Sequence, residues 1–324
     1  MFGKLIDILK ADPRKIVFTE GNDPRILEAS ARLLAGNFLT PVLVGNRDEI
    51  VVAAEHLGLN IRGAEILDPA TYPRMDEMVE KLVELRKGKM TPDECRATLQ
   101  KGNYFGTMLV KLGAADALLG GATYSTADTV RPALQIIKTK PGNSIVSSCF
   151  ILVRPAASGE NEVLVMGDCA INIEPNEDEL VEIATEVAKC ARVFGVDPRV
   201  ALLSYSTKGS GKGDNVDKMR NATAKILATN PDFAVDGELQ FDAAVSPKVA
   251  ETKCKGSAVA GKANTFIFPE IQSGNIGYKI AQRLGNFEAY GPILLGLNAP
   301  VNDLSRGCNA AEVYSMAIIT AALK

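Results

Sequence analysis

A loop near the middle of the chain combines glycines and lysines in a spacing that suits anion binding. The apolar run VALLSYS at 200–206 ends in this loop, and an amphipathic helical pattern begins directly after it. Its residues are Lys208, Gly209, Ser210, Gly211, Lys212 and Gly213. Glycines let backbone N–H groups turn toward one point, and a helix start adds partial positive charge. We therefore expect the loop to bind a phosphate or a carboxylate.

The spacing of these glycines does not fit a nucleotide site. It lacks the pattern GxxxxGK[ST], and Asp214 stands where the dinucleotide pattern GxGxxG has its last glycine. The sequence therefore indicates neither a nucleoside triphosphate site nor a nicotinamide dinucleotide site.

A second chemical group follows the strand-like run GPILLGL at 291–297. Ser305 offers a hydroxyl donor, Arg306 a forked cation for an oxyanion, and Glu312 a candidate base. Glu312 has a second interpretation, because Asn309 is a plausible N-cap and Glu312 stands three residues further on. All three side chains are expected at one strand-to-helix mouth.

Two other arginines also follow strand-like runs. Arg131 lies in GGATYSTADTVRPALQIIK at 120–138, after a double glycine and within the helix that comes next. We expect Arg131 to contact an anion, although an arginine at a helix start is often only solvated. Arg25 lies just inside a helix that follows KIVFTE at 15–20.

The chain contains a single histidine, His56, in an amphipathic segment. Ser-His-Asp, Cys-His and HExxH chemistry all need histidine beside other ligands or nucleophiles, so these classes are nearly excluded. The acidic residues Asp236, Glu238 and Asp242 match no known metal-binding loop, and we expect no metal site. Acid–base work then falls to carboxylates, thiols, lysine or the substrate.

Short apolar runs alternate with helical patterns along the whole chain. The runs are KIVFTE at 15–20, PVLVGN at 41–46, ADALLGG at 115–121, VALLSYS at 200–206 and NTFIFPE at 264–270. This alternation predicts an α/β fold with largely parallel sheets, in which ligands bind at the carboxyl ends of strands. Between 139 and 168, two strand-like runs flank the polar turn ASGEN at 157–161, which predicts a hairpin.

Length and composition set the class of protein. The 324 residues, 46% apolar and 23% charged, suggest two domains of a globular protein. A net charge of −3 without a basic run argues against nucleic acid, and no apolar run is long enough to span a membrane. Six scattered cysteines, no CxxC pair and no secretory pattern lead us to expect a cytoplasmic protein with reduced thiols.

Several segments together resemble the phosphate acetyltransferase, or phosphotransacetylase, family. They are TVRPALQIIKT, GDCAINIEPN, STKGSGKGDNVDKMRNAT, VDGELQFDAA, NTFIFPEIQSGNIGYKIAQRL and GPILLGLNAPVNDLSRG. These segments are spread over nearly the whole chain, which makes the resemblance far more specific than a short motif.

The resemblance implies two α/β/α domains with mostly parallel sheets, like the isocitrate and isopropylmalate dehydrogenases, and an active cleft between the domains. Residues 1–144 with 296–324 would form the first domain, and residues 145–295 the second, which carries the glycine-rich loop. Members of the family are commonly homodimers, so a homodimer is expected here.

The resemblance also implies reversible transfer of an acetyl group between coenzyme A and inorganic phosphate, with acetyl phosphate as the product. The family's cleft serine and arginines correspond to Ser305, Arg306 and Arg131, with weaker placements at Arg25 and Arg86. Glu312 stands where the family usually has aspartate. No cofactor is implied, because coenzyme A is a substrate.

We expect direct attack of the coenzyme's thiolate within a ternary complex, with Ser305 as a hydrogen-bond donor. Cys308 and Cys149 are weaker candidates for a covalent carrier, because neither has a histidine nearby in the sequence. Three alternatives stay open: a phosphate butyryltransferase, a dehydrogenase of the related fold, and a non-catalytic module that senses acyl-CoA or serves dimerisation.

Overall fold

The computed structural model describes residues 2–156 and 159–324 and divides into two compact units. One, here called the terminal unit, consists of residues 2–141 and 297–324. The other, the central unit, consists of residues 142–296. Each unit has its own sheet and its own hydrophobic core.

The sheet of the terminal unit is entirely parallel. Its strands, in spatial order, are β11 (Val301–Asp303), β4 (Ala117–Gly120), β1 (Arg14–Phe18), β2 (Leu39–Val44) and β3 (Glu65–Leu67). Strand β4 is buried along its whole length, and β1 and β2 along most of theirs. Burial on both faces explains why these strands appear in the sequence as continuous apolar runs.

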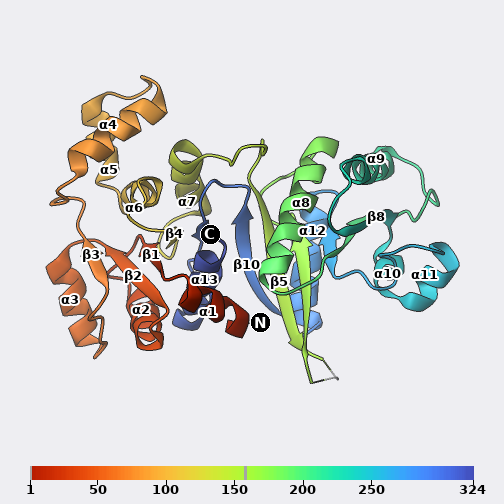
Figure 1. The fold of residues 1–324 in the computed structure, drawn as a ribbon, viewed down its shortest axis with the longest axis horizontal. Coiled ribbons are helices and arrows are strands. Elements are labelled where there is room, and N and C mark those ends of the chain that lie inside the picture. The colour runs from red at the N-terminus through yellow and green to blue at the C-terminus, as the bar shows by residue number, and fades with distance from the viewer. Residues whose placement is uncertain (1, 157–158) are drawn as a thin grey trace. The chain divides into compact units, whose positions relative to one another are not determined.

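Helices cover both faces of this sheet (Figure 1). One face carries α1 (Phe2–Ala11), α2 (Pro24–Gly36) and α13 (Ala310–Ala322), with α3 (Arg47–His56) beside α2. The other carries α4 (Met75–Arg86), α5 (Pro92–Leu99), α6 (Gly102–Lys111) and α7 (Thr126–Pro132). Helix α7 continues into a π-helical segment, Ala133–Ile137. Such segments frequently mark functional sites.

The sheet of the central unit is mixed. Its strands, in spatial order, are β10 (Glu288–Leu295), β5 (Ser147–Pro155), β6 (Asn161–Gly167), β9 (Thr265–Ile267), β7 (Arg199–Leu203) and β8 (Ala234–Leu239). β5 is antiparallel to both β10 and β6, whereas the other pairs are parallel. The antiparallel pairing of β5 and β6 confirms the expected hairpin. Residues 157 and 158 of its expected turn lie outside the described residues.

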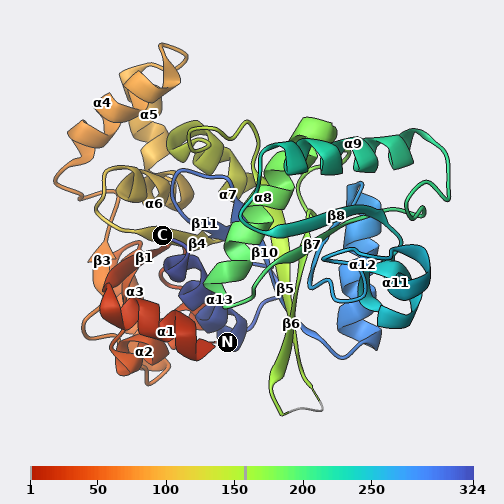
Figure 2. The ribbon, with the colours of Figure 1, turned by 45° about the vertical axis from the view of Figure 1, so that its right-hand side comes forward.

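Helices also cover both faces of the central sheet (Figure 2). α8 (Glu177–Val193) and α9 (Asp214–Ala228) pack on one face. α10 (Phe241–Val245), α11 (Pro247–Lys253) and α12 (Ile271–Leu284) lie on the other. The predicted fold class, two α/β/α layered units with mostly parallel sheets, is confirmed.

One sequence-based expectation about the strands is wrong. The run 291–297 does not lead directly into the loop of Ser305 and Arg306, because it belongs mainly to β10 of the central unit. The strand before that loop is β11, which pairs with β4. β11 has only three residues, two of them polar, so no apolar run signals it.

Among the described residues, no helix is both long enough and apolar enough to cross a membrane.

Candidate functional site

Three neighbouring strands of the terminal unit end at the same edge of its sheet. β1, β4 and β11 are parallel, with Phe18 opposite Leu119 and Gly120 opposite Asp303. The loops that follow these strands therefore lie together at this edge. Ligands of α/β sheets usually bind there, at the carboxyl ends of the strands. These loops begin at residues 19, 121 and 304.

The double glycine after β4 lets side-chain oxygens approach the backbone closely. A Cβ atom at Gly120 would collide with the hydroxyl groups of Thr19 and Tyr124, and one at Gly121 with the carboxylate of Asp303. Gly121 also has φ +97°, a conformation that side-chain-bearing residues rarely adopt. Both glycines are therefore structural requirements of this edge.

Glu20 is a buried carboxylate that holds the loop after β4. Its Oε1 accepts the backbone N–H groups of Gly121 and Thr123, both at 3.1 Å. Its Oε2 accepts the hydroxyl of Thr19 at 2.7 Å. Because Thr19 gives its only hydrogen to Glu20, the Tyr124 hydroxyl must donate to Thr19. Burial raises the pKa of Glu20 above its ordinary value.

Asp303, the last residue of β11, ties α7 to the same edge. Its two carboxylate oxygens accept the hydroxyls of Thr126 and Thr129, each at 2.6 Å. Burial raises the pKa of Asp303. Because α7 carries Arg131 and Ser305 follows two residues after Asp303, this carboxylate helps to place both candidate site residues.

Arg25 uses its guanidinium to connect three loops. Nε and Nη2 donate to the two oxygens of Asp23 at 2.9 and 2.8 Å. Nη2 also donates to the carbonyl of Ala122 at 2.8 Å, and Nη1 to those of Arg306 and Cys308 at 2.8 and 3.2 Å. The hydrogen bonds to Asp23 raise the pKa of Arg25. These contacts engage all five guanidinium N–H groups.

The loop after β11 presents its polar side chains on the surface of the terminal unit. Ser305, Arg306 and Glu312 are exposed, and the Ser305 Oγ accepts the N–H of Gly307 at 3.2 Å. Within the described part of the chain, the Arg306 guanidinium has no hydrogen-bond or ion-pair partner. Its donors are available to an anion.

Glu312 forms a capping box with Asn309, which is the second of the two roles that the sequence indicated for it. Its Oε2 accepts the Asn309 N–H at 3.0 Å, and its own N–H donates to Asn309 Oδ1 at 2.9 Å. The capping role is confirmed. A role as base stays a prediction, and the second carboxylate oxygen is the atom that could fill it.

Tyr104 interacts electrostatically with both Arg131 and Arg86. Burial raises the pKa of Tyr104, while the positive charges of Arg131 and Arg86 act in the opposite direction. Tyr104 donates its hydroxyl to Gln135 Oε1 at 3.0 Å. The Arg86 Nε is buried and lacks a hydrogen-bond acceptor among the described residues. The exposed Arg131 guanidinium therefore has donors that an anion could engage, whereas the unpartnered Arg86 donor lies inside the unit.

The glycine-rich loop lies in the central unit, at the carboxyl end of β7. Its donors are largely engaged inside the unit: Gly209 N–H bonds Glu238 Oε1 at 2.6 Å, and Gly211 N–H bonds Ser206 Oγ at 2.8 Å. The Lys208 ammonium pairs with Asp236 and also bonds the carbonyl of Gly237 at 2.9 Å.

These contacts change the expectation of a preformed anion cradle. The buried carboxylate of Glu238 accepts the Gly209 N–H and the Ser206 hydroxyl, and the Ser206 oxygen accepts the Gly211 N–H. These N–H groups therefore do not point at an empty position. Lys212 has an exposed side chain. Substrate binding by residues 208–213 stays a prediction.

The structure thus places the sequence-predicted residues in three groups. Arg25, Arg131, Ser305, Arg306 and Glu312 belong to the strand-end loops of the terminal unit and their helices. Arg86 lies at the end of α4, near Tyr104. Residues 208–213 lie in the central unit.

Sequence reasoning missed the supporting roles of Glu20, Tyr104 and Glu238. Glu20 and Glu238 come at or directly after the carboxyl end of a strand, where a carboxylate can accept N–H groups from neighbouring loops. That position was the available signal. Nothing in the spacing of Tyr104 indicates its proximity to two arginines.

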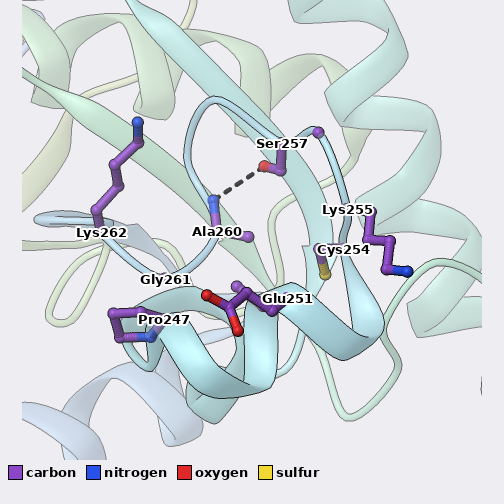
Figure 3. A pocket seen from close by; sticks show the side chains of 10 residues that line it. Pro247, Glu251, Cys254, Lys255, Ser257, Ala260, Gly261 and Lys262 are labelled. Carbon is purple, nitrogen blue, oxygen red and sulfur yellow. Dashed lines mark hydrogen bonds between the residues drawn. The ribbon is translucent and has the colours of Figure 1, made fainter.

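A pocket of about 470 Å³ lies in the central unit between α11 and the following loop (Figure 3). The ammonium groups of Lys255 and Lys262 lie on opposite sides of it and do not converge. None of the sequence-predicted site residues lines this pocket. Among the described residues, no cluster of three His, Cys, Asp or Glu side chains suits a metal ion.

Relatives of the chain share its full length. A phosphate acetyltransferase of Bacillus subtilis (strain 168) is 55% identical over 308 residues, which cover 95% of this chain and 94% of that protein. A phosphate acetyltransferase of Staphylococcus epidermidis is 50% identical over 323 residues, covering 98% and 97% of the two chains.

Solved structures agree in fold. A phosphotransacetylase from Streptococcus pyogenes superposes with a TM-score of 0.96 at 54% identity, covering 99% of this chain and 97% of that one. A branched-chain phosphotransacylase from Enterococcus faecalis V583 shares the fold, with a TM-score of 0.67 at 20% identity over 95% and 98% of the chains. The family model described as phosphate acetyl/butaryl transferase matches residues 1–321. This chain belongs to the phosphate acetyl/butaryl transferase family, as its sequence motifs indicated.

Proposed function

We propose that this chain is an acyltransferase that moves an acetyl group reversibly between coenzyme A and inorganic phosphate. The observation that carries this function is the full-length identity of 50–55% to proteins named phosphate acetyltransferase. The site geometry supports it, because Arg131 and Arg306 present cations to substrates that are both polyanions.

In the proposed mechanism, the thiolate sulfur of coenzyme A attacks the carbonyl carbon of acetyl phosphate. A C–S bond forms, the bond between the carbonyl carbon and the phosphate oxygen breaks, and phosphate leaves. Arg306 stabilises the carbonyl oxygen as it gains negative charge, and the Ser305 hydroxyl donates a hydrogen bond to it. Arg131 binds phosphate oxygens.

The thiol proton needs an acceptor, for which we propose Glu312. One oxygen of this carboxylate is engaged with the Asn309 N–H, which orients it, and the other takes the proton. A Glu312→Gln variant keeps the cap oxygen and loses the base. We expect its kcat to fall about 100-fold. Normal turnover in this variant would contradict the assignment.

A covalent acetyl-enzyme is not part of this mechanism. Burial raises the pKa of the Cys308 thiol, which favours its unreactive protonated form. Acid quench during turnover should therefore trap no acetylated cysteine. Recovery of an acetyl thioester on Cys308 would overturn the direct-transfer order.

The experiment that tests the function follows release of free thiol from acetyl-CoA upon addition of phosphate or arsenate. A parallel reaction with butyryl-CoA tests acyl-chain length. We expect acetyl-CoA to be preferred by about 10-fold or more in kcat/KM, because misplaced methylenes change transition-state binding by about 1–3 kcal/mol. Equal or faster turnover of butyryl-CoA would assign the chain to butyryl transfer. Nicotinamide reduction would indicate the dehydrogenase alternative.

We further propose that the protein works in the cytoplasm as a homodimer. All six cysteines are unpaired, which fits a reducing compartment. Helix α12 exposes Ile276, Ile280 and Leu284, at 57, 54 and 79%, in one i, i+4, i+8 stripe. An apolar stripe of this kind is typical of a surface that a partner covers.

Sedimentation velocity tests the dimer. The wild-type chain should sediment as a dimer, and Ile280→Glu should sediment as a monomer. Val52→Glu, at a similarly exposed apolar position on α3, should leave the dimer intact. A monomeric wild-type chain would refute the proposal.

A further inference from the structure

Arg25 differs from the other arginines of the strand-end loops in how its charge is used. Arg131 and Arg306 have exposed side chains, and in the described part of the chain neither guanidinium donates a hydrogen bond to protein. Arg25 is half-buried, and every one of its guanidinium N–H groups bonds to protein oxygen. A substrate anion would have to displace one of these bonds.

The three carbonyl acceptors of Arg25 lie far away in the sequence and close to the candidate site residues. The carbonyl of Ala122 belongs to the loop after β4, 97 residues away. The carbonyls of Arg306 and Cys308 belong to the loop after β11, 281 and 283 residues away. Two of these three carbonyls therefore come from the short segment that displays Ser305 and Arg306.

Asp23 fixes the guanidinium in the orientation that this bridge requires. The same carboxylate caps α2 by accepting the Arg25 N–H at 2.9 Å and grips the guanidinium with both oxygens. Although burial alone would raise the pKa of Asp23, its hydrogen bonds with Arg25 lower it. The same carboxylate thus holds both the start of α2 and the guanidinium that bonds the two loops.

We propose that Arg25 is a positioning residue, which places the Ser305–Arg306 loop through the carbonyl groups of Arg306 and Cys308 and does not bind substrate. The catalytic part of this proposal rests on the proposed acetyl transfer. A lysine cannot replace Arg25, because its ammonium is a point charge with three donors and cannot form a planar five-bond bridge.

Kinetics of Arg25→Lys and Arg25→Ala test the role. We expect kcat to fall about 100-fold, the effect of misplacing reacting groups by about 1 Å. The KM values for acetyl-CoA and phosphate should change less than about threefold, because no substrate contact is lost. The control is Arg32→Ala, which removes one cation from the same helix, where Arg32 stacks on Tyr314 at 4.4 Å. It should keep kcat within about twofold.

Hydrogen exchange gives a readout that does not depend on activity. Amides of residues 304–309 should exchange faster in Arg25→Lys than in the wild-type protein, and at the wild-type rate in Arg32→Ala. Unchanged protection of this loop in Arg25→Lys overturns the proposal. So does a raised KM for either substrate with normal kcat, which would make Arg25 a substrate ligand.

A second variant covers the case in which Arg25 variants do not fold. Asp23→Asn keeps a capping oxygen but loses the charged grip on the guanidinium. It should lower kcat about 10-fold at constant KM and loosen the same loop, and failure to do so also overturns the proposal. If the wild-type protein released no thiol upon addition of phosphate, the proposed function would be refuted but not the positioning role. Hydrogen exchange of residues 304–309 in Arg25→Lys and wild type would still decide that role.

Discussion

The strand-end loops of the terminal unit and the glycine-rich loop of the central unit are held by the same kind of hydrogen bond, but they differ in the cations they leave available. In both, a buried glutamate accepts backbone N–H groups from a loop that follows a parallel strand. Glu20 holds Gly121 and Thr123, and Glu238 holds Gly209. A buried carboxylate is stable there because several donors satisfy its oxygens.

The two regions differ in what is left over for a ligand. In the central unit, Lys208 is engaged by Asp236 and Gly237, and among the described residues Lys212 is the one lysine of this loop whose ammonium has no partner. In the terminal unit, one arginine and three carboxylates hold the loops, and Arg131 and Arg306 stay exposed. A glycine-rich loop is therefore not by itself evidence of an anion site. The site is better indicated where buried groups satisfy the backbone and leave other cations available.

The largest effect that would sharpen this comparison is expected at Arg306. Arg306→Ala should lower kcat about 100-fold, because the developing oxyanion loses its forked donor. Arg306→Lys should recover part of this loss, since charge is kept and the fork is not. Steady-state kinetics of thiol release measure both variants. Unchanged kcat in Arg306→Ala would place the chemistry away from the terminal unit's loops.

A loss of stability is expected at Gly121. Gly121→Ala should lower the free energy of unfolding by about 2–4 kcal/mol, because the new methyl group meets Asp303 and φ is positive. Gly113→Ala is the matched control, with φ +72° and no atom within 4 Å of the added carbon. It should cost about 1–2 kcal/mol. Equal losses in urea unfolding would show that the close approach of Asp303 is unimportant.

The lysines of the central loop give a smaller and more discriminating test. If the loop binds coenzyme A, Lys212→Ala should raise the KM for acetyl-CoA about threefold to fivefold, the worth of one exposed charge. Lys208→Ala should raise it less, because that ammonium is already paired. The reverse order would mean that substrate displaces Asp236 from Lys208.

The smallest effect concerns the pH dependence of stability. The pKa of Glu20 is raised in the folded protein, so folding favours its protonated form and the wild-type chain loses stability as pH rises above the ordinary value of 4.5. Glu20→Gln cannot titrate. Its stability relative to the wild-type protein should therefore increase as pH rises from about 4 and level off above the folded pKa. A relative stability that is flat or falls over this range would contradict the raised pKa.

Much of the fold could be predicted from local patterns. The apolar runs at 15–20, 41–46, 115–121, 200–206 and 264–270 each overlap a strand, because strands buried on both faces must be apolar. Strand β11 could not be predicted in the same way. Its Asn302 and Asp303 are polar, and their burial depends on Thr320, Thr126 and Thr129, which lie elsewhere in the sequence.

The candidate site also contains residues that the sequence indicated and residues whose roles only the structure shows. The residue types and motifs indicated Ser305, Arg306 and Arg131, because exposed hydroxyl and guanidinium groups after a strand suggest anion chemistry. The roles of Glu20, Asp303 and Tyr104 depend on contacts between loops that are distant in sequence. Spacing does not reveal which donor meets which acceptor.

The amino-acid sequence by itself determined the family and the alternation of strands and helices, and its single histidine argued against histidine-based chemistry. Only the tertiary structure decided which polar groups are consumed internally and which stay available. The reason is that hydrogen-bond partners of a buried group are set by how strands pair, and strand pairing brings together residues about a hundred or more positions apart, as Glu20 and Gly121 are.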